Sequence, residues 1–123
     1  MAEIIFSTSY DDRYTPQNVL SNDSSFWTST GLFPQEIVVQ LQAEKSINLI
    51  TIESFGVKKI SIETCENDSS VNFTKVAEKE IDNREAFQEV NLQFSSNKVV
   101  KIIKVIVLEG YDNFCAIRNI SFK

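Results

Sequence analysis

Apolar and polar residues alternate one by one in three stretches of this chain, and this period constrains the fold more than any other feature. Successive side chains of a strand point to opposite faces of a sheet, so a period of two predicts strands with one apolar and one solvent-facing side. The stretches are residues 37–41, 59–63 and 89–94. The inward residues that this pattern predicts are Ile37, Val39, Leu41, Ile60, Ile62, Val90, Leu92 and Phe94.

Residues 99–108 form a nearly continuous apolar run in which Lys98, Lys101 and Lys104 recur at every third position, as along an exposed helical stripe. Seven of these ten residues are β-branched. Branching at Cβ restricts rotamers in a helix and suits a strand that is buried on both faces. We therefore predict a central strand here.

Two other segments are less regular. In residues 46–55 the apolar positions change phase, which indicates either a bulge or a strand covered on both sides. Residues 78–87 are the one segment with the pattern of a short helical turn.

The chain has 123 residues, with 9 Phe and only 1 Met, and this composition favours pleated, half-buried surfaces over helices. Polar turn-forming residues separate the short strands, at the spacing of a β-sandwich. We predict one all-β domain over residues 1–123, an antiparallel sandwich of eight strands.

Net charge and segment lengths exclude several partner classes. The formal net charge is −5, so the basic footprint that binds phosphate backbones is missing and no nucleic-acid partner is expected. Neither a signal-peptide pattern at the start nor an apolar run of about 20 residues is found. We expect a soluble, unsecreted protein without membrane insertion, whose two cysteines, Cys65 and Cys115, are reduced and partly buried.

The chain lacks the residues of common catalytic sites. It has no His and only 3 isolated Gly, which excludes histidine-based catalysis and phosphate-cradling loops. Loop carboxylates, namely Asp11, Asp12, Asp23, Asp68 and Asp112, could pair for glycoside chemistry. Solvated loop acids are the favoured interpretation, so we expect no enzymatic activity and no required cofactor.

Three motifs bracket nearly the whole chain. Thr8-Ser9 leads to Asp11 and then to Pro16-Gln17-Asn18; Phe26-Trp27 is followed by Gly31-Leu32-Phe33-Pro34-Gln35-Glu36; Tyr111-Asp112-Asn113-Phe114 precedes a final strand over residues 116–122. With these motifs the chain resembles the small discoidin-like subunit of the intraflagellar transport B complex. The resemblance implies a jelly roll of the galactose-binding, discoidin-like type.

The resemblance also implies a function. It indicates a non-catalytic structural subunit that forms a heterodimer with a Rab-like small GTPase, joins other intraflagellar transport B proteins, and occurs in the cilium or flagellum and the cytoplasm. The alternative is a carbohydrate-binding module of the same fold. A third, weaker interpretation is a substrate-recruiting domain of a ubiquitin ligase.

The family carries a calcium site in the loop before the Phe-Trp pair. Asn18 matches its first ligand, whereas Ser21 stands in the place of a ligating Asp and Ser25 in the place of a Thr. A calcium site would therefore use Asn18, Asp23 and Ser25, with Asp23 as the substitute carboxylate. Because calcium needs six to eight oxygens, usually including carboxylates, we favour an ion-free loop in which Asn22 and Asp23 cap the turn.

Aromatic residues are the remaining candidates. Trp27 and Phe26 are expected to plug the end of the barrel core. If several of the other aromatic residues cluster at one end, they could form a sugar platform or a protein-binding hot spot, and the sequence leaves both open. These residues are Tyr10, Tyr14, Phe55, Tyr111 and Phe114.

Overall fold

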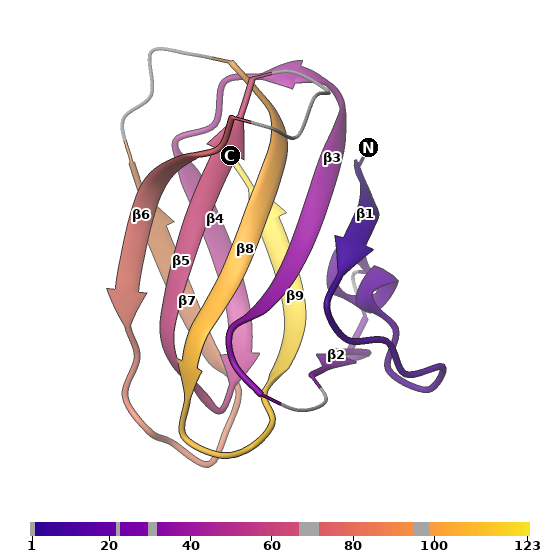
Figure 1. Ribbon diagram of the computed structural model, residues 1–123, viewed down its shortest axis with the longest axis vertical. Helices are drawn as coiled ribbons and strands as arrows, with labels where there is room; N and C mark the ends of the chain where they lie inside the picture. Colours follow the sequence, from indigo (N-terminus) through magenta and orange to yellow (C-terminus); the bar gives the residue numbers. More distant parts are fainter. Residues whose placement is uncertain (1, 22, 30–31, 67–71, 95–98) are drawn as a thin grey trace.

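Two antiparallel sheets face each other in the computed structural model, which describes residues 2–21, 23–29, 32–66, 72–94 and 99–123 (Figure 1). The five-stranded sheet has the order β1 (Ala2–Ser7), β3 (Gln35–Lys45), β8 (Val100–Gly110), β5 (Val57–Cys65) and β6 (Thr74–Glu80). The four-stranded sheet has the order β2 (Trp27–Thr28), β9 (Ala116–Phe122), β4 (Leu49–Phe55) and β7 (Gln88–Gln93). The predicted all-β jelly roll is confirmed, and the two-residue strand β2 is added to the eight that the sequence predicts.

The predicted central strand is confirmed as β8, which pairs with β3 on one side and with β5 on the other. Ile103, Val105 and Val107 point into the main core. On the opposite face Ile102 packs with Val38 of β3 and Cys65 of β5 in a second cluster, against Phe73. The apolar run thus reflects burial on both faces.

The lysines of this run do not form a helical stripe. The Lys104 ammonium lies 4.2 Å from the centre of the Phe73 ring, and the Lys101 ammonium donates to the Gln42 carbonyl at 2.8 Å. Lys98 falls outside the described residues.

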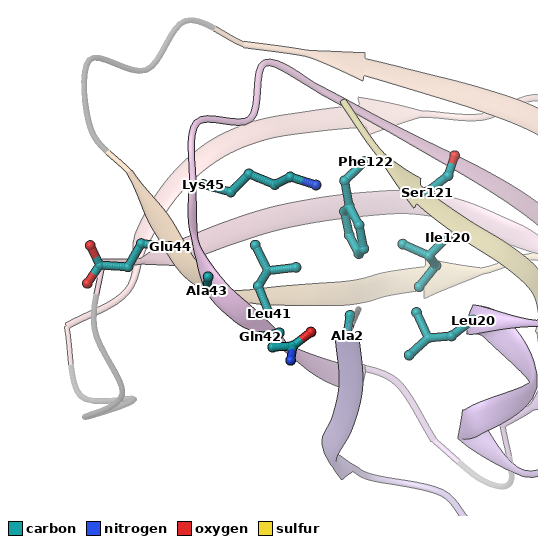
Figure 2. A pocket seen from close by; sticks show the side chains of 10 residues that line it. All are labelled: Ala2, Leu20, Leu41, Gln42, Ala43, Glu44, Lys45, Ile120, Ser121 and Phe122. Atoms are coloured by element: carbon teal, nitrogen blue, oxygen red, sulfur yellow. The ribbon is translucent and has the colours of Figure 1, made fainter.

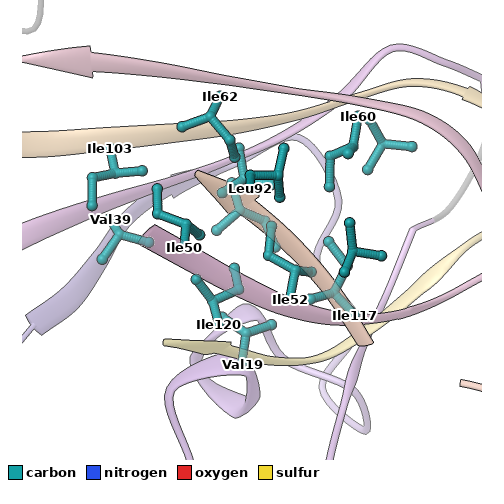
Figure 3. Packing of buried hydrophobic residues seen from close by; sticks show 14 of the residues in the cluster. Val19, Val39, Ile50, Ile52, Ile60, Ile62, Leu92, Ile103, Ile117 and Ile120 are labelled. Carbon is teal, nitrogen blue, oxygen red and sulfur yellow. The ribbon is translucent and has the colours of Figure 1, made fainter. Parts of the chain in front are cut away.

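The main core consists largely of isoleucines from both sheets (Figure 3). The predicted inward residues of β3, β5 and β7 are buried there, and Phe94 packs against them half-buried. The expectation that the other side of residues 59–63 faces solvent is wrong for Ser61, which is 2% exposed. Ser61 lies between Ile106 of β8 and Glu78 of β6, its cross-strand neighbours, and these long side chains flank the small serine.

The phase change in residues 46–55 marks a change of element. β3 ends at Lys45 and β4 begins at Leu49, so the fully buried Ile47 lies in the connection between two strands of different sheets. The phase change itself comes from the turn before β4, whose side chains do not follow the strand period. A bulge does occur later in the segment, where the pairing of β4 with β9 shifts register between Glu53 and Ser54. The alternative of a strand covered on both sides is wrong, because buried and half-buried residues alternate along β4.

The helical turn predicted for residues 78–87 is also wrong. Glu80 ends β6, and the segment up to β7 is an irregular connection in which the Ile81 amide donates to the Lys58 carbonyl at 2.9 Å. The described residues instead contain a 3-10 helix, η1 (Pro16–Leu20), with Pro at its start. Proline favours this position because its fixed φ suits the first helical turn and its missing N–H is not needed there.

The helix η1 closes one side of the sandwich. It packs against β9, β1 and β2, and its Val19 is fully buried in the main core. The two sheets meet at this side without direct strand pairing, so the inserted helix supplies the apolar contact. Within the described residues, no helix combines the length and apolarity needed to cross a bilayer.

Cys65 and Cys115 are thiols outside any disulfide, and their exposures of 3% and 0% show deeper burial than the partial burial that the sequence predicts. Burial raises the pKa of the Cys115 thiol to about 11, and a hydrogen bond with Ser29 opposes this rise. A buried thiol with little thiolate is a poor nucleophile.

We therefore expect iodoacetamide to label Cys115 at pH 8 about a hundredfold more slowly in the native protein than in urea, since two pKa units reduce the thiolate fraction by that factor. The Cys65→Ala variant isolates the signal, which mass spectrometry measures over time. Equal rates in native buffer and in urea would contradict the burial of this thiol.

Candidate functional site

Two of the three motifs meet in a partly buried hydrogen-bond network around Ser9 and Gln35. The Trp27 indole N–H donates to the Ser9 carbonyl at 3.0 Å. The hydroxyls of Thr8 and Ser9 both donate to the Gln35 Oε1, at 2.5 and 2.6 Å, and the Gln35 side-chain amide donates to the Leu32 carbonyl at 2.6 Å. These residues therefore hold the N-terminal segment onto the start of β3. Gly31 of the same motif lies outside the described residues.

The Phe26-Trp27 pair is divided between two faces. Trp27 is fully buried in the core, as predicted, whereas Phe26 is only half-buried and does not join the core cluster. Consecutive residues of an extended chain point in opposite directions, so burial of the indole turns the Phe26 ring outward. The expectation that both rings plug the core is wrong for Phe26.

The loop before Phe26 is held by its own hydrogen bonds. The Asn18 side-chain amide donates to the Phe26 carbonyl at 2.9 Å. The Asp23 carboxylate accepts the Ser25 amide at 2.9 Å and also the Ser25 hydroxyl. These bonds from Ser25 lower the pKa of Asp23. The three predicted metal ligands thus have protein partners, and Asn22, the other capping candidate, lies outside the described residues.

The donor set of this loop does not fit calcium. Asp23 is its one carboxylate, and it is exposed and engaged by Ser25. The Asn18 backbone carbonyl already accepts the Ser21 amide at 3.1 Å. Among the described residues, no three Asp, Glu or Cys side chains gather where they could hold a metal. A calcium ion at Asn18, Asp23 and Ser25 stays a prediction, and the ion-free loop remains our preference.

Five aromatic rings from separate segments form a continuous row, here called the aromatic surface. Its successive ring centres are 4.8, 5.9, 6.0 and 6.3 Å apart. In order along the row the members are Tyr14, Phe26, Phe87, Phe55 and Phe114. Tyr14, Phe55 and Phe114 are among the predicted aromatic candidates, and Phe26 and Phe87 join them in the row.

The aromatic surface lies on the outer face of the four-stranded sheet. Along β4, buried Ile50 and Ile52 alternate with half-buried Glu53 and Phe55, which therefore point away from the core. The end of β4 and the starts of β7 and β9 meet at one end of the sheet, the lower end in Figure 1.

An ion pair completes this surface. The Arg118 guanidinium lies 4.4 Å from the centre of the Phe87 ring. Its Nε and Nη2 donate to the Glu53 Oε2 at 3.1 and 2.6 Å. All three side chains are partly buried, so Arg118 is held in place by a ring and a carboxylate together.

The other two predicted aromatic residues lie outside the row. Tyr10 is exposed, and no ring contact ties it to the others within the described part of the chain. The Tyr111 hydroxyl donates to the Ile81 carbonyl at 2.6 Å. Phe87 and Arg118 are not among the residues that the sequence motifs indicate. The alternation in residues 89–94, continued backward by two positions, would have placed Phe87 on the outward face of β7.

The loop carboxylates form local contacts. The Asp11 carboxylate accepts hydrogen bonds from two nitrogens of the Arg13 side chain, and these bonds lower the pKa of Asp11. Asp112 accepts the Asn113 amide at 2.8 Å. Asp12 and Asp23 are exposed, and Asp68 lies outside the described residues. These contacts agree with the interpretation of the acids as solvated loop residues.

A cavity of about 480 Å³ opens at the opposite end of the sandwich (Figure 2). Its wall is mainly apolar, with Leu20, Leu41, Ile120 and Phe122 lining it. The Lys45 side chain reaches toward Phe122, while the Glu44 carboxylate points away. A binding pocket usually combines an apolar wall with a few convergent polar groups. The aromatic surface, which carries a fixed ion pair, is the better candidate site.

The chain is similar in sequence to a known domain family and to known proteins. A family model described as F5/8 type C domain matches residues 3–120. The chain is 33% identical to intraflagellar transport protein 25 of Chlamydomonas reinhardtii over 96% of its own length and 62% of that relative. It is 27% identical to the mouse intraflagellar transport protein 25 homolog, over 97% of the chain and 84% of the relative.

The fold is similar to solved structures as well. A CBM32 domain from Clostridium perfringens, solved in complex with GalNAc-β-1,3-galactose, matches with a TM-score of 0.84 over 98% of this chain and 94% of that one. The sequences are 19% identical, so this likeness shows the shared fold alone.

We expect calcium to leave the melting temperature unchanged, because the loop is already held by hydrogen bonds. An ion present at a hundred times its dissociation constant would add about 2.7 kcal/mol, enough to raise Tm by several degrees. Thermal melts in calcium and in chelator measure this difference. A rise of several degrees that the Asp23→Ala variant abolishes would establish the calcium site.

Replacing Asn18 by Ala should lower the free energy of unfolding by about 1 kcal/mol, since the Phe26 carbonyl loses its donor. Urea unfolding followed by the fluorescence of Trp27, the only Trp, measures the change. Gln17→Ala is the matched control, because Gln17 is the exposed neighbour on the same helix. Equal stability of the two variants would show that this bond does not hold the loop.

Proposed function

The chain belongs to the F5/8 type C domain family, and we propose that it is a non-catalytic subunit of the intraflagellar transport machinery that acts by binding proteins. The observation that carries the proposal is the similarity to intraflagellar transport protein 25, which extends over 96–97% of the chain in relatives from an alga and a mouse. The chain spans 62% of the algal relative's length, so the proposal concerns the domain that the two share.

The proposal includes a place and partners. The names of the relatives support residence in the cilium or flagellum and association with other intraflagellar transport B proteins. We further propose a heterodimer with a Rab-like small GTPase. A stable heterodimer needs a rigid surface with aromatic anchors, and the aromatic surface has this character.

Carbohydrate binding is the second candidate, and the saccharide complex of a similar fold speaks for it. Stacking on a sugar needs an open ring face. On the aromatic surface Arg118 lies over Phe87, and Tyr14 stacks on Phe26 with Arg13 over its ring. The faces of Tyr14, Phe26 and Phe87 are thus partly covered, an arrangement that suits packing against protein side chains better than sugar stacking, although Phe114 is 40% exposed.

We expect the tagged chain, expressed in ciliated cells, to localise to the cilium and to co-purify a small GTPase together with other transport subunits. Mass spectrometry of the captured proteins identifies them, and the tag alone is the control. Calorimetry with galactose should give no specific heat. Recovery of glycoproteins alone, together with saturable galactose binding, would replace the transport proposal with the carbohydrate-binding one.

A further inference from the structure

We propose that the aromatic surface is the docking site for the protein partner, and that this partner brings a lysine or arginine to Glu89 beside an apolar patch. The inference rests on the proposed function, since it assumes that the chain works by binding a protein. It identifies the surface used and the chemistry that the partner must present.

Glu89 stands in an unfavourable place for an isolated protein. It is directly opposite Glu53 in the antiparallel pairing of β7 with β4. Both side chains point away from the core, because they alternate along β4 and β7 with the residues that are buried in it. Like charges at directly opposite positions destabilise a sheet.

In the described part of the chain, the local cations compensate Glu53 but leave Glu89 without an ion pair. Arg118 directs its two donors to the Glu53 Oε2. The Lys79 ammonium of the adjacent β6 donates to the Asn91 carbonyl at 3.4 Å. Among the residues that the structure describes, no lysine or arginine lies within ion-pair distance of Glu89. The carboxylate is exposed and available to a partner's cation.

Other carboxylates rim the aromatic surface. Asp12, Glu85 and Asp112 are exposed, and each lies two residues before a member of the row. The cations near the row are fewer. Arg13 lies over the Tyr14 ring and pairs with Asp11, Arg84 is exposed in the connection before β7, and Lys58 lies near Tyr111 and Glu109. Acids nevertheless predominate around the row.

The composition of the surface identifies the kind of partner. Aromatic residues and arginine are enriched at the centres of protein interfaces, and charged residues are enriched at the rim. A partner with an apolar centre and a basic rim complements this arrangement, whereas phosphates of nucleic acid or anionic lipid would be repelled. Charge complementarity therefore favours a basic protein surface as the occupant.

The test compares Glu89→Arg with Glu44→Arg in the tagged chain expressed in ciliated cells. Glu44 is an exposed carboxylate on β3, at the opposite end of the sandwich, so it controls for the change in net charge. We expect Glu89→Arg to reduce recovery of identified transport subunits by about tenfold or more, because a like charge then faces the partner's cation. Glu44→Arg should recover as much as the wild type.

Thermal melts of the purified variants exclude misfolding as the cause. Glu89→Arg places a cation opposite Glu53, so its Tm should equal or exceed that of the wild type. Lower recovery with undiminished Tm is the result that supports docking at this surface.

The outcomes separate the two proposals. If the wild type recovers no transport subunit, the proposed function fails. If the wild type and Glu89→Arg recover the same subunits equally, the proposed function stands and the docking site is wrong. Saturable binding of galactose that Glu89→Arg abolishes would assign the surface to a saccharide and overturn the protein partner.

Discussion

The buried hydrogen bonds at Ser9 hold together the part of the fold on which the rest depends. Its carbonyl accepts the Trp27 indole, and its hydroxyl bonds to Gln35, so three segments distant in sequence meet at one small residue. A buried polar group without a partner costs about 1–3 kcal/mol, so these groups strongly favour a single arrangement. Once Trp27 is fixed inside, Phe26 must point outward, and the aromatic surface begins there.

The aromatic surface is as rigid as the strand ends that carry it. A single residue, Gly56, connects β4 and β5, which belong to different sheets, and its φ of 78° is one that other residues rarely adopt. A Cβ at this position would lie 3.3 Å from the Phe114 carbonyl. The tight turn thus keeps Phe55 beside Phe114. A surface fixed before binding loses less conformational entropy when a partner docks.

Local periodicity predicts four of the strands and much of the core, whereas the site depends on contacts between distant segments. The buried faces of β3, β5 and β7 follow from alternation, and β8 follows from its β-branched run, because each signal lies within one strand. The row from Tyr14 to Phe114 draws its rings from five segments, and no periodicity links them. Phe87 falls within the helical turn that the sequence predicts for residues 78–87, whereas it lies one residue before β7 and continues the outward alternation of that strand. The predicted loop residues Asn18, Asp23 and Ser25 proved to be neighbours in a hydrogen-bonded turn, and metal binding by them stays untested.

Arg118 shows why the isolated domain cannot neutralise its own outer face. One guanidinium lies over the Phe87 ring and directs Nε and Nη2 to Glu53 on β4, and it forms no ion pair with Glu89 on β7. A neutral residue in place of Glu89 would remove the repulsion without disturbing the core, because that side chain is exposed. A protein that retains such a charge gives up some stability at this position, as binding surfaces commonly do. The loss is recovered when a partner supplies a cation, so the Glu53–Glu89 pair becomes a source of specificity in the complex.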